Sequence, residues 1–325
     1  MDNAKGINLL DSNHVRLPAW LDDILFNRYG AVYERCPEEV KRTPDSVGFD
    51  KIYLGTYFPR SFAEAYYILG RLLRNGNYLD ALKNEEELNV LDFCCGTGGE
   101  IIGVLAIFQE MLPNLKRINI DAFDANEEYI FNLNHIIDEI KPSFSIEISN
   151  HLECIFVENE HHLDAVAACT QKLYHLILSF KALNELIQAN TFPNENIYYK
   201  IAKKYLPLLA ENGIMLLSDL THRNNEGGFY YPEKLNEGIN SLVRECKGYK
   251  SIFPYSCPFY ERTCKGCYMQ DTVYVTHTRQ FRDISKIAYR VIGKTLFADR
   301  ILADIQPARC RAIQQYADKR APYLI

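Results

Sequence analysis

The most constraining feature of this sequence is Asn89–Gly103, where an apolar run passes through closely spaced glycines into a helix-forming segment. Its centre reads Val90-Leu91-Asp92-Phe93-Cys94-Cys95-Gly96-Thr97-Gly98-Gly99-Glu100. Glycine has no Cβ, so it reaches positive φ and lets a ligand approach the backbone closely. In open α/β sheets, ligands bind where such a turn follows the carboxyl end of a strand. The segment therefore predicts a strand, a ligand-binding turn and a helix, in that order.

The residues after about position 88 alternate between short apolar runs and helical segments, which is typical of a mostly parallel α/β sheet. Residues 15–85 have apolar positions near helical spacing and are expected to be mostly helical, in particular Leu17–Tyr33 and Ser61–Leu73. The expected strands are Asn89–Cys94, Ile118–Phe123, Ser145–Ser149, Leu173–Phe180, Gly213–Leu217, Asp271–Thr276 and Ile287–Gly293. The expected helices between them include Glu100–Met111, Glu127–Glu139 and Pro193–Tyr205.

Three regions follow from these patterns. Residues 1–85 form a helical N-terminal region, residues 86–240 a Rossmann-like cofactor-binding domain, and residues 241–325 a basic, cysteine-bearing C-terminal region. No apolar run approaches the roughly 20 residues that a membrane span needs. The N-terminal residues lack a signal or transit pattern, so we expect a cytoplasmic protein without a membrane partner.

Charge is distributed unevenly along the chain. Residues 241–325 hold 15 Lys and Arg against 7 Asp and Glu, although the whole chain has a net charge of −6. A basic region on an acidic body favours a polyanionic partner, although a solvated basic face would give the same count. We expect phosphate contacts from Arg279, Arg282, Lys286 and Arg290.

Two acidic residues decide between the cofactors that bind such a glycine turn. A dinucleotide-binding turn has similar glycines, but nothing downstream supplies a hydride-transfer site. Asp92 lies at the strand end as in methyltransferase domains, and Asp124 ends the next strand, where a carboxylate can hold ribose hydroxyls. These features favour S-adenosylmethionine. The predicted cofactor-binding residues are Asp92, Cys94, Gly96, Gly98, Asp124, Ala125 and Ser179.

The fourth expected strand runs into a polar turn. In methyltransferase domains this strand end faces the methyl group and its acceptor, so Lys181, Asn184 and Glu185 are the candidate catalytic residues. An equally good interpretation is that Asn184 and Glu185 cap or solvate the following helix.

A cysteine cluster gives the strongest metal signal. Cys264 and Cys267 have the spacing that places two thiolates on one side of a turn, and Cys257 precedes them. A closed tetrahedral site needs a fourth ligand, for which Cys310, Cys246 and His277 are candidates. Unrelated thiols in a reducing compartment are the plainer alternative.

Taken together, these segments resemble the methyltransferase-like family tied to the small subunit of mitochondrial and bacterial ribosomes. The resemblance lies in the order of the motifs over roughly residues 50–310. The motifs are Tyr57–Ala63, Val90–Gly99, Leu183–Leu186, Phe253–Cys267 and Ser285–Tyr289. The chain departs from the family's pattern at Cys94, which stands where the first glycine of Gly-x-Gly-x-Gly is usual.

The resemblance implies a class I methyltransferase fold, an iron–sulfur cluster and a role in small-subunit rRNA or its assembly. Its cluster ligands would be Cys257, Cys264, Cys267 and Cys310, with zinc as the alternative metal. The leading hypothesis is thus an S-adenosylmethionine-dependent methyltransferase acting on RNA, or an assembly factor with that fold, which contacts rRNA through the basic C-terminal region.

Two other functions fit the same residues. A methyltransferase of a small molecule or peptide, in a biosynthetic or defence pathway, could use the aromatic segments Phe229–Tyr231 and Tyr255–Tyr260 to line an acceptor pocket. A non-catalytic, metal-containing binding protein would use the metal site to organise an interaction surface.

Overall fold

The computed structural model describes residues 10–11, 13–35, 48–168, 172–224, 227–253, 270–303 and 305. The chain divides into two compact units. Unit 1 comprises Met1–Val157 with Thr272–Ser285, and unit 2 comprises Glu158–Asp271 with Lys286–Ile325. The three-region division drawn from the sequence stays a prediction.

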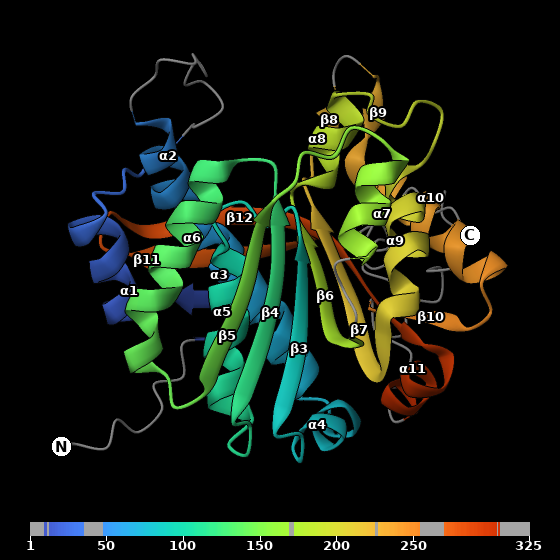
Figure 1. Ribbon diagram of the computed structural model, residues 1–325, viewed down its shortest axis with the longest axis horizontal. Helices are drawn as coiled ribbons and strands as arrows, with labels where there is room; N and C mark the ends of the chain where they lie inside the picture. The colour runs from blue at the N-terminus through green and yellow to red at the C-terminus, as the bar shows by residue number, and fades with distance from the viewer. Residues whose placement is uncertain are drawn as a thin grey trace, which may run out of the picture. The chain divides into compact units, whose positions relative to one another are not determined.

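Unit 1 contains three parallel strands in the order β5-β4-β3 (Figure 1). They are β3 (Glu87–Phe93), β4 (Arg117–Asp124) and β5 (Glu147–Cys154). Their apolar residues are in register: Leu88 pairs with Ile118, and Ile118 pairs with Ile148. Helices α5 (Gly99–Met111) and α6 (Glu127–Ile140) connect the strands. This succession of strand, turn and helix was predicted from the sequence.

The N-terminal part of unit 1 is largely helical, as expected. It contains α1 (Ala19–Asp23), the π-helix η1 (Ile24–Arg28), α2 (Phe49–Ile52), a second π-helix η3 (Tyr53–Tyr57), α3 (Phe58–Leu73) and α4 (Gly76–Leu82). Two short strands were not expected, β1 (Leu10–Asp11) and β2 (His14–Arg16). Strand β2 pairs in parallel with β11 (Gln270–His277), at Tyr274–Thr276.

A buried ion pair connects α3 to the strand that follows β11 along the chain. The Arg60 guanidinium donates to both carboxylate oxygens of Asp283, at 2.7 and 3.0 Å, and the Tyr33 hydroxyl donates to the same carboxylate. The side chains of Arg60 and Asp283 are only 14% and 6% exposed. This ion pair therefore ties the N-terminal helices to a strand near the other end of the chain, within unit 1.

Unit 2 contains β6 (Tyr174–Phe180) parallel to β7 (Leu209–Asp219). Strand β12 (Gln280–Lys294) runs antiparallel to β7, and β10 (Tyr249–Phe253) runs antiparallel to β12. The other elements are α7 (Glu160–Ala168), α8 (Leu183–Gln188), α9 (Ile197–Tyr205), β8 (Arg223–Asn224), β9 (Phe229–Tyr230), α10 (Tyr231–Glu245) and α11 (Thr295–Leu302).

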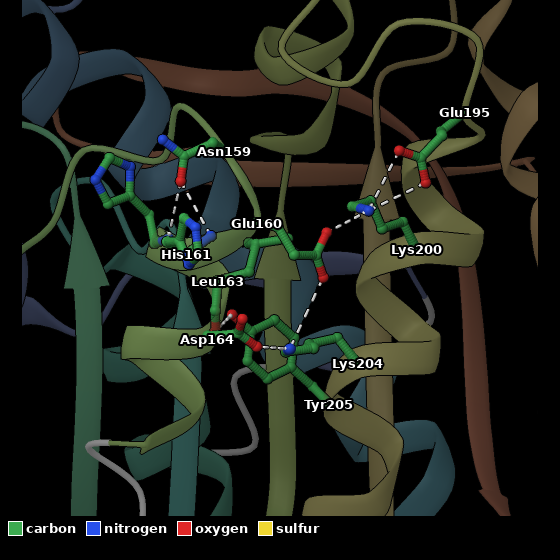
Figure 2. A network of polar contacts seen from close by, with 10 residues as sticks. Asn159, Glu160, His161, Leu163, Asp164, Glu195, Lys200, Lys204 and Tyr205 are labelled. Carbon is green, nitrogen blue, oxygen red and sulfur yellow. Dashed lines mark hydrogen bonds and ion pairs between the residues drawn. The ribbon is translucent and has the colours of Figure 1, made fainter.

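Helices α7 and α9 are joined by ion pairs, shown in Figure 2. Glu160 lies between Lys200 and Lys204, and Lys204 also pairs with Asp164. The Asn159 side chain accepts from the His161 amide at 3.0 Å at the start of α7. The lysine side chains are 15% and 24% exposed, while the two carboxylates are about half exposed. These contacts fix the position of α7 within unit 2.

Among the residues that the structure describes, no helix is long and apolar enough to cross a membrane.

Candidate cofactor and acceptor sites

The turn between β3 and α5 is built from left-handed backbone conformations. Cys94, Gly96 and Gly98 have φ values of 60°, 51° and 75°. The Cys95 amide donates to the Phe123 carbonyl at 3.0 Å, which ties the turn to the end of β4. Glycine reaches positive φ without strain, whereas this conformation destabilises an L-residue such as Cys94 by about 1 kcal/mol. The turn thus keeps its geometry although cysteine replaces the first glycine.

Asp124 lies directly against this turn. Its Oδ2 accepts from the Gly96 amide at 2.7 Å, and its Oδ1 accepts from the Asn126 amide at 2.9 Å. Burial raises the pKa of Asp124, while hydrogen bonds from the amides of Asn126, Gly96 and Ala125 act in the opposite direction. The structure therefore brings the two sequence motifs together and orients the Asp124 carboxylate. Ala125, also predicted to bind the cofactor, is exposed just beyond it.

Asp92, in contrast, accepts no hydrogen bond from a backbone amide of the described residues. Its side chain is fully buried, and neither carboxylate oxygen has a hydrogen-bond partner among the described residues. Burial and the nearby negative charge of Asp124 raise the pKa of Asp92. Buried polar groups in native proteins are nearly always hydrogen-bonded. A hydrogen-bond donor or a positive charge brought by a ligand would satisfy these two oxygens.

Helix α3 approaches α5 so closely that their backbones are in contact. A Cβ added at Gly99 would lie 2.4 Å from the Phe58 carbonyl oxygen, and one at Gly103 would lie 2.5 Å from that of Phe62. Gly103, at the edge of the glycine-rich sequence, thus serves helix packing. The close approach also sets the start of α3 beside the first turn of α5.

In unit 2, the predicted catalytic residues surround the end of β6. Lys181 has a left-handed φ of 54°, and its amide donates to the Ser218 carbonyl at 2.7 Å. The Asn184 side-chain amide donates to the Lys181 carbonyl at 2.6 Å. Asn184 is 3% exposed, and Glu185 is exposed in the first turn of α8. Asn184 therefore stabilises the Lys181 turn, and Glu185 faces solvent.

The sequence analysis missed a buried carboxylate in this region. Asp219, at the end of β7, accepts from the Asn184 amide at 2.8 Å and from the Tyr198 hydroxyl at 2.7 Å. Burial raises the pKa of Asp219 to about 6, partly offset by these hydrogen bonds. The signal was the polar pair Ser218-Asp219 after the apolar run of β7, which the expected strand excluded by ending at Leu217. Ser179, predicted to bind the cofactor, is buried, and its hydroxyl has no partner among the described residues.

The predicted metal ligands Cys257, Cys264, Cys267 and Cys310 lie outside the described residues. Within the described ranges, no group of three or more His, Cys, Asp or Glu could hold a metal ion. Of the alternative fourth ligands, Cys246 is half-buried and His277 is a buried residue of β11 whose ring stacks on Phe26. The metal centre stays a prediction.

The basic residues of β12 and the turn before it do not all face solvent. Arg279, Arg282 and Lys286 are exposed, as phosphate contacts require. Arg290 is 2% exposed, and its guanidinium donates to the Asn236 side chain at 2.6 Å and the Tyr289 carbonyl at 2.8 Å. The expectation that Arg290 contacts phosphate was wrong, because its position on β12 faces the interior of unit 2.

Comparisons with known proteins find only distant similarity. No family model matches the chain, and no curated protein matches it. TrmN from Thermus thermophilus has a TM-score of 0.38 and 14% identity, covering 74% of this chain but only 53% of TrmN. The plantazolicin methyltransferase BpumL, solved with a monoazolic desmethylPZN analog and S-adenosylhomocysteine, has a TM-score of 0.38 and 16% identity, covering 73% of this chain and 89% of BpumL.

A third similar structure is a proposed rRNA-methylase from Clostridium thermocellum, with a TM-score of 0.37 and 11% identity; the match covers 70% of this chain and 94% of the other. At such scores the likeness carries no information on substrate. The fold class rests on the strands themselves: β3, β4 and β5 are parallel, as are β6 and β7, and helices connect them. The predicted mostly parallel, Rossmann-like α/β fold is thus confirmed.

Proposed function

We propose that this chain is an S-adenosylmethionine-dependent methyltransferase whose acceptor is RNA of the small ribosomal subunit, or a factor that assists assembly of that subunit with the same binding fold. The observation that carries the proposal is Asp92. A fully buried carboxylate without a partner lies at the carboxyl end of β3, next to a turn of three left-handed residues. Parallel α/β folds bind nucleotide-like ligands at this position.

S-adenosylmethionine supplies a methyl group that is already activated by a positively charged sulfur. The acceptor atom forms a bond to the methyl carbon, the carbon–sulfur bond breaks, and its electron pair remains on sulfur while the acceptor loses a proton. Such a displacement depends on orientation and on exclusion of water more than on covalent catalysis. The chain's own task is then to hold both reactants.

The described residues fit that task. Asp92 would accept a donor of the bound ligand, and Asp124, already oriented by the amides of Gly96 and Asn126, would accept hydroxyls. For the acceptor we keep Lys181 and Glu185 as candidate contacts. Asn184 receives a positioning role, because its side-chain amide is engaged by the Lys181 carbonyl and by Asp219. A metal held by the C-terminal cysteines would be structural and take no part in these steps.

RNA is favoured as the acceptor by the charge of β12 and of the turn before it. Arg279, Arg282 and Lys286 are exposed there, while the nearby acid Asp283 is buried and paired with Arg60. Of the aromatic residues expected to line a small-molecule pocket, Tyr231 is fully buried and its hydroxyl accepts from Gln188 and Asn224. Phe229 and Tyr230 are half-buried, and Tyr255–Tyr260 lie outside the described residues. Tyr231 is therefore a core residue and does not line a pocket.

The first experiment measures cofactor binding by calorimetry on the full chain and on Asp92→Asn. We expect the wild-type protein to bind S-adenosylmethionine and the variant to bind it at least about tenfold more weakly, since a charge-assisted contact is worth about 1.5–3 kcal/mol. If the wild-type protein does not bind S-adenosylmethionine, the proposed function is wrong.

The second experiment supplies labelled S-adenosylmethionine together with total RNA, a small-molecule extract or a peptide pool. Label in RNA supports the proposed acceptor, and label only in the other fractions contradicts it. Binding of both cofactor and RNA without transfer identifies the assembly factor.

RNA binding itself is tested by its salt dependence. Each lost phosphate contact lowers the slope of log affinity against log salt by about 0.7 for single strands. Changing Arg279, Arg282 and Lys286 to Gln should lower the slope by about 2. The matched control changes Lys83, Lys116 and Arg117 to Gln, which are exposed residues already paired with acids. Equal effects of the two triple variants would contradict a specific RNA surface.

A further inference from the structure

The hairpin of β11 and β12 carries an exposed phenylalanine beside its turn. The two strands are neighbours in the sheet, and Thr278 and Arg279 form the turn between them. Phe281 is 74% exposed, and its ring stacks on no other described residue. Single exposed apolar side chains are common on protein surfaces. The surroundings of Phe281 therefore decide whether its ring serves a partner.

Phe281 lies just past the part of β12 that is buried in unit 1. Successive side chains of a strand point to opposite faces, so Phe281 and Asp283 share one side of β12. Asp283 is buried by its contacts with Arg60 and Tyr33. Phe281, two residues nearer the turn, is in solvent. Its ring is thus open to a partner, on a strand that is anchored two residues away.

The arginines on either side of Phe281 along the chain each lie against an aromatic ring. The guanidinium carbon of Arg282 is 4.2 Å from the centroid of the Tyr274 ring. That of Arg279 is 5.9 Å from the centroid of the Phe26 ring. Both arginines remain exposed. A cation–π contact restricts a long side chain without neutralising its charge. The two guanidiniums are therefore held near the turn and keep their positive charge.

The turn itself is fixed by polar contacts. The Thr278 amide donates to the buried Asp22 carboxylate at 2.9 Å. The Thr276 hydroxyl donates to the Phe281 carbonyl. Groups that are held in place before a ligand arrives lose less conformational freedom on binding. The tip of the hairpin, residues 278–282, is thus preorganised.

The exposed charge on this part of unit 1 is positive. Within residues 13–16 and 272–285, the exposed charged side chains are those of Arg16, Arg279 and Arg282. None of the three forms an ion pair with a described acid. The acid within these two segments, Asp283, is buried and paired with Arg60. Such a surface attracts anions.

An exposed ring between unneutralised arginines matches the chemistry of unpaired RNA. Single strands offer base faces that stack on aromatic rings, and phosphates that arginines contact. A duplex offers the phosphates but keeps its bases stacked inside. An anionic lipid surface would also attract the arginines, but it binds elements with a broad apolar face. The neighbours of Phe281 along the chain, Gln280 and Arg282, are polar and charged.

We propose that the tip of the β11–β12 hairpin binds a single-stranded segment of RNA, with one base stacked on the Phe281 ring and nearby phosphates held by Arg279 and Arg282. The inference rests on the proposed function and narrows its partner from RNA in general to RNA with unpaired bases. Phe281 is then the residue that discriminates single strands from duplexes. The arginines alone do not discriminate, because both forms carry phosphates.

The test measures binding of the full chain to a fluorescent oligouridine of about 10 nucleotides, and to its duplex with oligoadenosine, by fluorescence anisotropy. Phe281→Leu removes the ring and keeps an apolar side chain. It should weaken binding of the single strand about 5- to 50-fold and change binding of the duplex less than about 2-fold. Its salt slope should equal that of wild type, because no phosphate contact is lost.

Phe281→Trp keeps a ring for stacking and should bind the single strand at least as tightly as wild type. The introduced indole gives a second measurement, since stacking on a base should quench its fluorescence with the single strand and not with the duplex. The wild-type protein, whose only tryptophan is Trp20, is the blank for this measurement.

The matched control is Phe131→Leu, because Phe131 is a 61% exposed phenylalanine of unit 1 on a helix without basic residues, α6. This variant should bind both RNAs as wild type does. Equal losses in Phe281→Leu and Phe131→Leu would overturn the role of Phe281.

The two proposals fail in different ways. If the wild-type protein binds neither RNA, the proposed RNA acceptor fails and the role of Phe281 falls with it. If wild type binds the single strand and Phe281→Leu binds it equally well, only the role of Phe281 is overturned. Vesicles of phosphatidylcholine and phosphatidylserine test the lipid alternative. Binding to vesicles that Phe281→Leu abolishes, with RNA binding unchanged, would assign the tip to a lipid surface and overturn the inference.

Discussion

Replacing Gly103 with alanine tests whether the contact between α3 and α5 is as close as the structure indicates. The new Cβ would lie 2.5 Å from the Phe62 carbonyl oxygen and 3.2 Å from the Ala65 Cβ. The first of these groups is backbone, so relief requires a shift of a whole helix. Adding volume to a well-packed core costs about 1–3 kcal/mol, and an obstacle made of backbone places the cost near the upper end.

The helix propensity of alanine offsets part of that cost. Gly to Ala within a helix stabilises it by about 1 kcal/mol. The net expectation is a loss of about 2 kcal/mol in the free energy of unfolding. Urea denaturation followed by circular dichroism measures this loss as a lower midpoint with an unchanged slope.

Gly76→Ala is the matched control, because Gly76 begins α4 and nothing lies within 4 Å of its added Cβ. That variant should be neutral or slightly more stable. A Gly103→Ala protein as stable as Gly76→Ala would refute the proposed backbone contact. Since α5 begins directly after the glycine turn, Gly103→Ala should also weaken cofactor binding.

Four further results are expected. Burial raises the pKa of Asp92, so the stability that its carboxyl contributes is fully present below its ordinary pKa of 3.8 and is lost as pH rises through the raised pKa. Measured by urea titration, the free energy of unfolding of Asp92→Asn should therefore rise relative to that of wild type as pH increases. A difference that stays constant with pH would contradict this. Arg60→Leu leaves the buried Asp283 carboxylate without its cation and should cost about 3 kcal/mol; a double variant with Asp283→Leu that loses the full sum of the single changes would contradict the pairing. Lys200→Met removes ion pairs to half-exposed carboxylates, so thermal melting should reveal a loss below about 1 kcal/mol, and a larger loss would show that these pairs are better shielded from water than their exposure indicates. Protein purified without oxygen should carry iron or zinc that Cys264→Ser removes, and metal-free wild-type protein with full ligand binding would refute the metal centre.

Much of the fold could be predicted from the sequence because its signals are local. The expected strands Asn89–Cys94 and Ile118–Phe123 match β3 and β4 within a few residues, since apolar runs between turn residues have few alternatives. Strand β2 was missed because three residues, His14–Arg16, carry no pattern of their own and become a strand only by pairing with β11. Helix α10, with buried Leu235, Ile239 and Leu242, was missed although its apolar spacing is helical.

The candidate sites were predictable in part for the same reason. The meeting of Gly96 with Asp124 follows from two adjacent parallel strands and could be inferred from motif spacing. The contact of Gly99 with the Phe58 carbonyl could not be inferred, because it depends on the packing of α3 against α5. The engagement of Asn184 by Asp219 likewise joins residues 35 positions apart through the pairing of β6 with β7.

The ion pair between Arg60 and Asp283 also constrains how the protein can be made. Unit 1 takes its last strand residues from Thr272–Ser285, after more than a hundred residues that belong to unit 2. During synthesis, the N-terminal helices and β2 therefore leave the ribosome long before their partners exist. A fragment ending near residue 157 would contain the whole glycine turn, but it would lack the strand beside β2 and leave Arg60 without its counter-ion. Domain dissection by terminal truncation would thus separate the turn from residues that stabilise its own unit.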